Sequence, residues 1–278
     1  MKIKYLGTAA AEGIPALLCN CSVCEKARAL GGKNLRTRSQ AMVDGDMLLD
    51  MPPDTFTHFH THNVNLLNIK HWLISHTHSD HFYPKELPFT LNGNFAHYPD
   101  DWQGIDFHAS VDFERYFNEY VFDENHKKYI RFHTENAFCE FKTGQYSVIP
   151  LKANHGTDNP FIYAIKKGGK SLLYTHDTGP FFDEVWEYLK NSGIVFDLVS
   201  LDCTAGALME YDYPMHMCLG WNIDCRDRMI KEGIATKNTK FVLNHYSHNG
   251  KDTVYEDFKI IAEKYGFIAS YDGLEIEF

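Results

Sequence analysis

Short apolar runs separated by Gly, Asn and Asp recur along the chain, and this pattern is typical of β-strands. Asp44-Gly45-Asp46 lies between two such runs and indicates a hairpin turn. The clearest runs are residues 2–6, 41–43, 47–49, 72–75, 146–151, 161–165, 171–175, 198–201, 241–244 and 274–278. Strands are therefore expected to dominate the first half of the chain.

Apolar residues at helical spacing predict helices over residues 182–190, 221–231 and 253–264. Because helices alternate with strands in the second half, we expect stacked layers of sheet and helix. No repeat or linker divides the sequence, so we predict a single domain over residues 1–278. Residues 92–128 are aromatic, acidic and irregular, and we interpret them as a candidate insertion covering the functional site.

The charge pattern restricts the partners of the protein. A formal net charge of −10 argues against non-specific nucleic-acid binding, which needs an excess of Lys and Arg. A small anionic substrate stays compatible with this charge, because a bound metal can supply local positive charge. No run approaches the roughly 20 apolar residues of a membrane span. We therefore predict a cytoplasmic protein without a membrane segment, for which homodimer formation is left open.

One segment concentrates metal-ligand residues directly after the apolar run 71–75. It contains His76, His78, Asp80 and His81. Four ligand-type residues in six positions are hard to explain as a chance polar loop. We expect His76 and His78 to serve one ion and Asp80 and His81 to suit a second. Nitrogen ligands with a few carboxylates favour zinc or another first-row metal over magnesium or calcium.

Four ligands in one loop cannot complete two coordination spheres, so others must come from later in the chain. His155, Asp177 and His245 each follow a predicted strand. A single residue of this kind would be an ordinary strand-end residue. Their recurrence at the ends of successive strands makes all three candidate metal ligands.

The His76–His81 segment, followed at long intervals by His155, Asp177 and His245, resembles the pattern of the metallo-β-lactamase superfamily. The resemblance implies an α/β fold, the four-layer αβ/βα sandwich of two mixed sheets flanked by helices. It also implies a dinuclear site, in which His76, His78 and His155 hold one ion, Asp80, His81 and His245 hold the other, and Asp177 bridges them. Di-iron redox members carry Glu at the position of His78, so hydrolysis is favoured over electron transfer.

A second cluster of ligand-type residues lies near the N-terminus, at Cys19, Cys21 and Cys24. An odd total of seven Cys fits a disulfide framework poorly, and three thiolates at this spacing favour a structural zinc site. Free structural cysteines are the alternative. Spacing alone does not identify a fourth ligand, and His248, three residues beyond His245, is the best candidate.

Residues 7–16, the Cys triplet and the His-x-x-His at 245–248 resemble the cyclic phosphodiesterases of the phosphonate-degrading C–P lyase pathway. Those enzymes act on a phosphoribosyl 1,2-cyclic phosphate. The resemblance implies that His248 is the fourth structural ligand, and that His216 is an active-site histidine outside the metal shell. The hydrophobic surroundings of His216 and the 92–128 segment have no clear counterpart in that family.

Together these features predict a metal-dependent hydrolase, and most specifically a phosphodiesterase acting on a small diester, cyclic or open, through a metal-activated hydroxide. Asp80 and His216 are the expected catalytic residues, and Asp50 is expected to orient a ligand histidine through a hydrogen bond. The cofactors would be two divalent ions (zinc, manganese or iron) and one structural zinc. The alternatives are an RNA nuclease, a lactonase, a thioesterase, or a non-catalytic accessory protein, because pyrroloquinoline-maturation proteins share the Gly-Ile-Pro and Cys-rich start.

His58, His60 and His62 form a further histidine cluster in a helix expected over residues 54–66, with Asp54 as its cap. Residues two apart on a helix do not face each other, so the three cannot share one ion. We interpret this helix as solvated or as part of the rim of the substrate site.

Overall fold

The structure is a computed structural model that describes residues 1–91, 95–121 and 124–278. Its strands form two seven-stranded sheets. In spatial order the first sheet contains β14 (Glu275–Glu277), β1 (Lys2–Gly7), β2 (Gln40–Val43), β3 (Met47–Leu49), β4 (His71–Leu73), β5 (Ile105–Ala109) and β6 (Ile130–Thr134). The second contains β13 (Ile268–Ala269), β12 (Ala235–Asn244), β11 (Phe196–Asp202), β10 (Lys170–Thr175), β9 (Phe161–Lys167), β8 (Tyr146–Lys152) and β7 (Phe141–Thr143).

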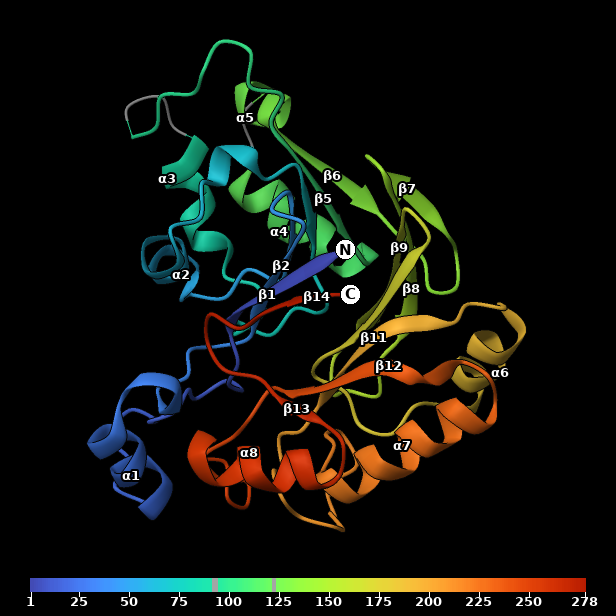
Figure 1. The fold of residues 1–278 in the computed structure, drawn as a ribbon. Coiled ribbons are helices and arrows are strands. Elements are labelled where there is room, and N and C mark those ends of the chain that lie inside the picture. Colours follow the sequence, from blue (N-terminus) through green and yellow to red (C-terminus); the bar gives the residue numbers. More distant parts are fainter. Residues whose placement is uncertain (92–94, 122–123) are drawn as a thin grey trace.

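Both sheets are mixed. Strands β3 to β6 run parallel to one another, as do β10 to β13, while the remaining neighbours are antiparallel. The helices are α1 (Ser22–Leu30), α2 (Thr55–His62), α3 (Leu87–Leu91), α4 (Glu114–Tyr120), α5 (Glu124–Tyr129), α6 (Asp183–Asn191), α7 (Leu219–Lys231) and α8 (Tyr255–Lys264). Figure 1 shows α2 to α5 beside the first sheet and α6 to α8 beside the second.

The side chains of the central strands enter two different cores in turn, because successive side chains of a strand point to opposite faces. In β3, Met47 and Leu49 belong to the core between the sheets, whereas Leu48 belongs to the core beneath α2 to α4. A third core joins the second sheet to α6, α7 and α8 through residues such as Trp186 and Phe258. Three apolar interfaces thus separate four layers, which confirms the predicted αβ/βα sandwich.

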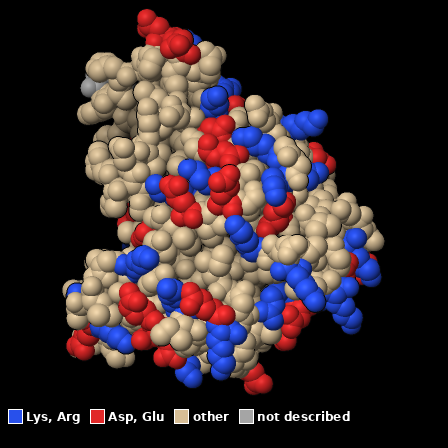
Figure 2. Space-filling view, in the orientation of Figure 1, with Lys and Arg blue, Asp and Glu red and all other residues tan. Residues whose placement is uncertain are grey.

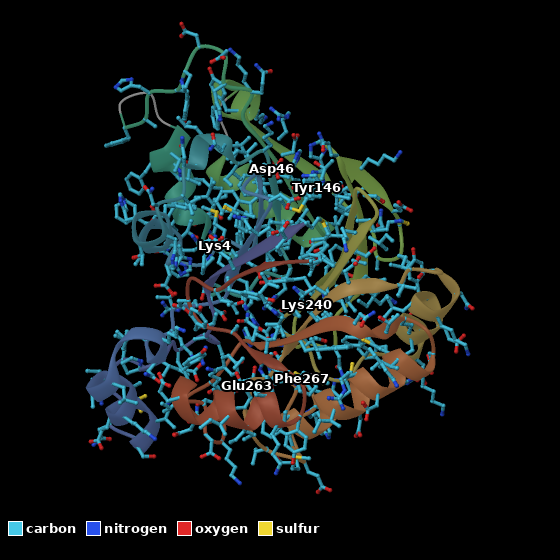
Figure 3. All side chains as sticks on the ribbon, in the orientation of Figure 1. Lys4, Asp46, Tyr146, Lys240, Glu263 and Phe267 are labelled. Atoms are coloured by element: carbon cyan, nitrogen blue, oxygen red, sulfur yellow. The ribbon has the colours of Figure 1, made fainter. Side chains whose placement is uncertain are left out.

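Polar contacts also join the two sheets. The hydroxyl of Tyr146, at the start of β8, donates to Asp46 Oδ1 at 2.5 Å, in the turn between β2 and β3. Figure 3 shows the two side chains next to each other. Burial and the neighbouring carboxylates raise the pKa of Tyr146, so the phenol stays protonated and keeps donating. This contact fixes the hairpin turn predicted at Asp44-Gly45-Asp46 against the second sheet.

Each of the ten predicted strands and four predicted helices is present, with ends shifted by up to six residues. Strands β5, β6, β7 and β13 and helices α1, α3, α4 and α5 were not predicted. Strand β5 lies inside the first sheet although it falls in the 92–128 segment, whose residues 92–94 and 122–123 lie outside the described residues. That this segment is an insertion stays a prediction.

The surface carries charges of both signs. Figure 2 shows Lys and Arg interleaved with Asp and Glu over one face, without a continuous basic area. Among the described residues, no helix combines the length and apolar character that crossing a bilayer requires.

Candidate metal centre

The candidate ligands lie in loops that leave strands of both sheets. The His76–His81 loop follows β4, His155 follows β8, Asp177 follows β10 and His245 follows β12. Strands β10, β11 and β12 are parallel, so their carboxyl ends open onto the same edge of the second sheet. The shared topology therefore brings together ligands that are up to about 170 residues apart in the sequence.

The backbone at these loops is unusual. Asp50, Asp177 and His245 adopt left-handed conformations, with φ of 66°, 58° and 64°. Non-glycine residues rarely do so, and each such conformation costs roughly 1–3 kcal/mol. Buried packing keeps all three in place, since their exposed fractions are 3% or less. Such local strain is typical of functional sites.

The first cluster consists of His76, His78, His155 and Asp177. The Nδ1 atom of His78 lies 3.1 Å from Nε2 of His76 and 3.1 Å from Nε2 of His155. Asp177 Oδ2 lies 3.3 Å from His76 Nε2, and Asp177 Oδ1 lies 3.2 Å from His155 Nδ1. His76 is buried, whereas His78 is exposed towards the pocket.

The second cluster consists of Asp80, His81, Asp177 and His245. His81 Nε2 lies 3.2 Å from His245 Nε2 and 3.4 Å from Asp80 Oδ2. The same Asp177 Oδ2 that contacts the first cluster lies 3.4 Å from His81 Nε2 and 3.9 Å from His245 Nε2. One carboxylate thus belongs to both clusters.

The donor chemistry of the two clusters fits metal ions. Nitrogens of His76, His78 and His155 converge, and one shared proton cannot satisfy all three. Asp177 Oδ1 is buried without hydrogen-bond geometry to any described residue. Nitrogens about 2.0–2.1 Å from a tetrahedral ion would be roughly 3.3 Å apart, close to the separations observed. Divalent ions would satisfy these groups.

Buried carboxylates hold the outer nitrogens of two of the histidines. Asp50 Oδ2 lies 2.7 Å from His81 Nδ1, which is the contact expected for Asp50. Asp202 Oδ2 lies 3.2 Å from His245 Nδ1, and Thr204 Oγ1 lies 2.9 Å from the same nitrogen. Such contacts fix ring orientation and increase ligand basicity.

Electrostatics keep the central carboxylate ionised. Burial opposes ionisation of Asp177, but His245, His216 and the other histidines around it hold its pKa well below the usual range. Burial lowers the pKa of His76 to about 4, so its ring is neutral at pH 7, as a metal ligand must be.

His216 lies beside the shared carboxylate. Its Nδ1 is 3.0 Å from Asp177 Oδ1 and 3.3 Å from Asp202 Oδ2. Burial disfavours protonation of this ring, but the two carboxylates outweigh burial and raise its pKa to about 11. His216 therefore lies at the candidate metal centre. Its role as a catalytic acid stays a prediction.

The two clusters open into a pocket of 360 Å³. Besides candidate ligands and His216, its wall includes Glu12, Tyr211, Tyr213 and Ser247, none of which was predicted. Asp202 and Thr204 were also missed. Asp202 directly follows the predicted strand 198–201, so the strand-end reasoning that identified Asp177 could have identified it.

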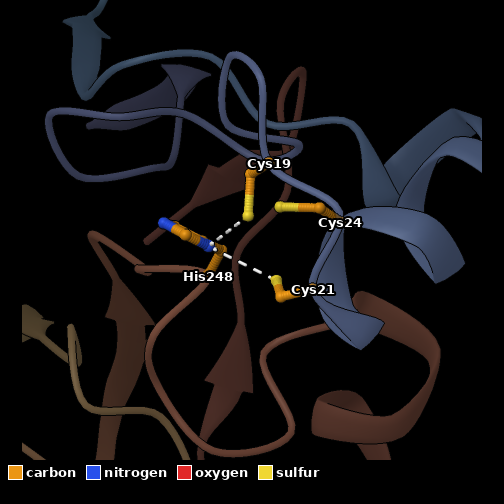
Figure 4. Close-up of side chains that lie close together, drawn as sticks. All are labelled: Cys19, Cys21, Cys24 and His248. Atoms are coloured by element: carbon orange, nitrogen blue, oxygen red, sulfur yellow. Dashed lines mark hydrogen bonds between the residues drawn. The ribbon is translucent and has the colours of Figure 1, made fainter.

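Cys19, Cys21, Cys24 and His248 form a separate cluster (Figure 4). His248 Nδ1 lies 3.4 Å from the sulfur atoms of both Cys19 and Cys21. The interaction with His248, followed by backbone and thiol contacts, lowers the pKa of Cys21 to about 6. A tetrahedral zinc site would place nitrogen and sulfur about 3.5 Å apart, so these four residues fit that ion.

The histidines of α2 join none of these clusters, and the expectation of a solvated or rim position is wrong for His58, whereas His62 is half-buried. His58 is buried, 2.7 Å from Thr37 Oγ1 and 2.6 Å from Gln40 Oε1. His62 Nε2 lies 2.9 Å from the Leu6 carbonyl oxygen. Asp54 precedes the helix but makes no capping bond, because its carboxylate accepts hydrogen bonds from Arg38 instead.

Comparison with solved structures shows the same architecture. A diphosphatase of the PhnP family superposes with a TM-score of 0.71 at 19% identity, covering 100% of this chain and 97% of the other. Zn²⁺-bound PqqB from Methylobacterium extorquens gives 0.70 at 18% identity, with 100% of both chains covered. The short form of human tRNase Z gives 0.65 at 17% identity, covering 100% of this chain and 99% of the other.

At these identities the likeness shows the fold alone. No protein of curated function gives a significant match to the chain. The model of the beta-lactamase superfamily domain matches residues 47–246, which include every candidate ligand of the dinuclear site. On the basis of this match and the four-layer fold, the chain belongs to the metallo-β-lactamase superfamily.

Proposed function

We propose that this protein is a metal-dependent phosphodiesterase that hydrolyses a small diester, cyclic or open, at a dinuclear centre. One observation carries the proposal: Asp177 Oδ2 contacts both His76 and His81, so a single carboxylate joins two sets of ligand atoms at the floor of an open pocket. Two ions held close together are typical of centres that cleave phosphodiesters by in-line displacement.

The proposed ligand sets are those of the two clusters, with Asp177 shared. Bound divalent ions would lower the pKa of water towards neutrality and stabilise negative charge on phosphate oxygens. Asp50 and Asp202 would hold the imidazoles of His81 and His245 in ligating orientation. Zinc, manganese and iron are all compatible with mixed histidine and carboxylate ligands.

Hydrolysis adds a water oxygen to phosphorus and breaks the bond to the leaving oxygen, which then takes up a proton. In this proposal His216 would supply that proton. It lines the pocket, and its Nδ1 faces Asp177 and Asp202. These carboxylates favour the protonated ring, and because Nδ1 faces them, Nε2–H would be the proton donor to the leaving oxygen. An open diester yields a phosphomonoester and an alcohol, and a cyclic diester yields one molecule that carries both groups.

Metal analysis joined to a substrate panel tests this proposal. Protein loaded with zinc or manganese would be assayed on bis(p-nitrophenyl) phosphate, a lactone and a thioester. We expect metal-dependent cleavage of the phosphodiester and little cleavage of the others. Preferred cleavage of the lactone or the thioester would show that the protein is a different kind of hydrolase. About one ion per chain with no ester cleaved would favour an accessory metal-binding protein.

We further propose that Cys19, Cys21, Cys24 and His248 hold a structural zinc. The four ligand atoms lie within 4.8 Å of one another, as one tetrahedral ion requires. A cytoplasmic location and a homodimer stay predictions, to be tested by fractionation and by measurement of the mass in solution.

A further inference from the structure

One segment beside the catalytic pocket carries both tyrosines of its wall. Residues 207–217 lie between β11 and α7, and we call this segment the aromatic strap. Tyr211 and Tyr213 line the pocket from the strap, and so does His216. The proposed proton donor and the two tyrosines therefore belong to one continuous stretch of backbone.

Close backbone contacts hold the aromatic strap near both of its ends. Near its start, a Cβ on Gly220 would lie only 1.9 Å from the Met209 carbonyl oxygen. Near its end, a Cβ on Gly179 would lie 1.7 Å from the Pro214 carbonyl oxygen, which also accepts a hydrogen bond from Asn154 Nδ2 at 3.2 Å. No other residue type fits at either glycine without displacing the strap. The tyrosines are thus presented by a backbone that its neighbours fix, and such preorganisation favours ligand binding.

The tyrosine rings form a corner that leads towards the metal centre. The centroids of Tyr211 and Tyr213 lie 6.4 Å apart, with their ring planes at 74°. The ring of Tyr213 is 5.8 Å from that of His216, which in turn is 5.9 Å from the ring of His245. Tyr213 is 48% exposed, so part of its ring is free to contact a ligand. A flat ring stacked on that free surface would lie next to the proposed acid.

The remainder of the pocket wall is polar. Besides the tyrosines, the histidines and the candidate ligands, it contains two alanines, a glycine and the side chains of Glu12, Thr204, Ser247 and Asn249. No Leu, Ile, Val, Met or Phe is among the described residues of this wall. An acyl chain would therefore find no aliphatic surface here. The Asn249 amide is exposed and offers both a donor and an acceptor to the edge of a bound ring.

We propose that the aromatic strap binds a nucleobase, and that the substrates are phosphodiesters of nucleosides; the inference rests on the proposed phosphodiesterase function. Nucleobases combine flat aromatic faces with hydrogen-bonding edges, and this wall offers surfaces for both. Stacking of a base on an aromatic side chain changes binding roughly 5- to 100-fold. The strap carries Tyr213 and His216 three positions apart, so a base stacked on Tyr213 holds the ester close to the proposed acid.

The reaction on a nucleoside 2′,3′-cyclic phosphate balances as follows. The hydroxyl of water bonds to phosphorus, and one bond from phosphorus to a ribose oxygen breaks. That oxygen takes a proton from His216, which regains one from the water. The product is a nucleoside monophosphate.

The test compares two cyclic diesters that differ only at C1′ of the ribose: adenosine 2′,3′-cyclic phosphate, and methyl riboside 2′,3′-cyclic phosphate, in which a methoxy group replaces the base. We expect the wild-type protein to prefer the adenosine diester by about 10-fold or more in kcat/KM. Tyr213→Leu removes the ring and should reduce this preference roughly 5-fold or more, mainly through KM, whereas Tyr213→Phe keeps the ring and the preference. Phe56→Leu, at an exposed ring of α2 outside the pocket wall, is the matched control and should behave like the wild type.

Equilibrium binding provides a readout that is independent of turnover. Calorimetry on zinc-loaded protein should show tighter binding of adenosine 3′-phosphate than of methyl riboside 3′-phosphate, and a smaller difference in Tyr213→Leu at unchanged zinc content. Equal kcat/KM for the two cyclic diesters in the wild type overturns the inference and leaves the phosphodiesterase intact. Cleavage of bis(p-nitrophenyl) phosphate without cleavage of either cyclic diester has the same meaning.

The variants and the remaining outcome separate the strap from the function. An unchanged preference in Tyr213→Leu overturns the role of the aromatic strap. Loss of the preference in Tyr213→Phe as well would show that the hydroxyl, and not stacking on the ring, recognises the base, and would also overturn the inference. Absence of turnover for both cyclic diesters and for bis(p-nitrophenyl) phosphate overturns the function and the inference together.

Discussion

Replacing Asp202 with asparagine removes a buried charge behind the second cluster at nearly constant side-chain size. Asp202 is fully buried, and its Oδ1 accepts from the backbone N–H groups of Thr204 and Met217 at 2.9 and 3.0 Å. An asparagine oxygen can accept the same two bonds, so we expect the fold to be retained. The contact at 3.2 Å between Oδ2 and His245 Nδ1 is lost, because an amide nitrogen would face the ring.

Loss of such an outer contact typically weakens metal binding 10- to 100-fold, or about 1.4–2.7 kcal/mol. The Asp202→Asn variant should therefore release one ion to a chelator at a free-metal concentration roughly 10- to 100-fold higher than the wild type, while the other ions stay bound. Asp197→Asn, at the opposite end of β11, is the control and should titrate like the wild type. Identical titrations of Asp202→Asn and the wild type would show that Asp202 does not support metal binding through His245.

Three further changes test separate parts of the account. His216→Gln should lower kcat on a phosphodiester roughly 10²- to 10⁴-fold at unchanged metal content, and full activity would exclude it as the acid. Cys21→Ser should remove one zinc and lower Tm; retained zinc would exclude Cys21 as a ligand. Burial lowers the pKa of His58 to about 4, so the unfolded chain binds more protons between pH 4 and 6.5 and stability falls as pH falls. Unfolding in urea should show that His58→Gln removes about 2 kcal/mol of the loss between pH 7 and 5, and equal losses would contradict this.

The parts of the fold that could be predicted are those in which burial leaves a clear apolar pattern in the sequence. Met47, Leu48 and Leu49 are all apolar because β3 is covered on both faces, so the pattern reveals the strand. Strands β5 and β6 were missed because polar residues interrupt them. Asp106 and Arg131 are register partners that pair across these strands, with Nε to Oδ1 at 2.8 Å, a contact invisible in the isolated sequence.

The candidate ligands could be predicted because residues able to bind metal stand directly after recognisable strands. His76 to His81 are dense enough to stand out, and His155, Asp177 and His245 each follow a recognisable strand. Asp202 also directly follows a predicted strand, so the same reasoning could have identified it. Glu12 and Tyr211 lie in loops whose approach to the pocket depends on tertiary structure. His58 was misjudged because its partners on other elements compensate the cost of burying it.

The central claim is that Asp80 belongs to one of two metal sites that act together. The most direct measurement is the metal content and phosphodiesterase activity of Asp80→Ala beside the wild type, both loaded with the same metal. We predict that the variant lacks one ion, keeps the zinc of the Cys19, Cys21, Cys24 and His248 cluster, and loses nearly all turnover of bis(p-nitrophenyl) phosphate. A variant that retains every ion and full turnover would contradict the dinuclear mechanism.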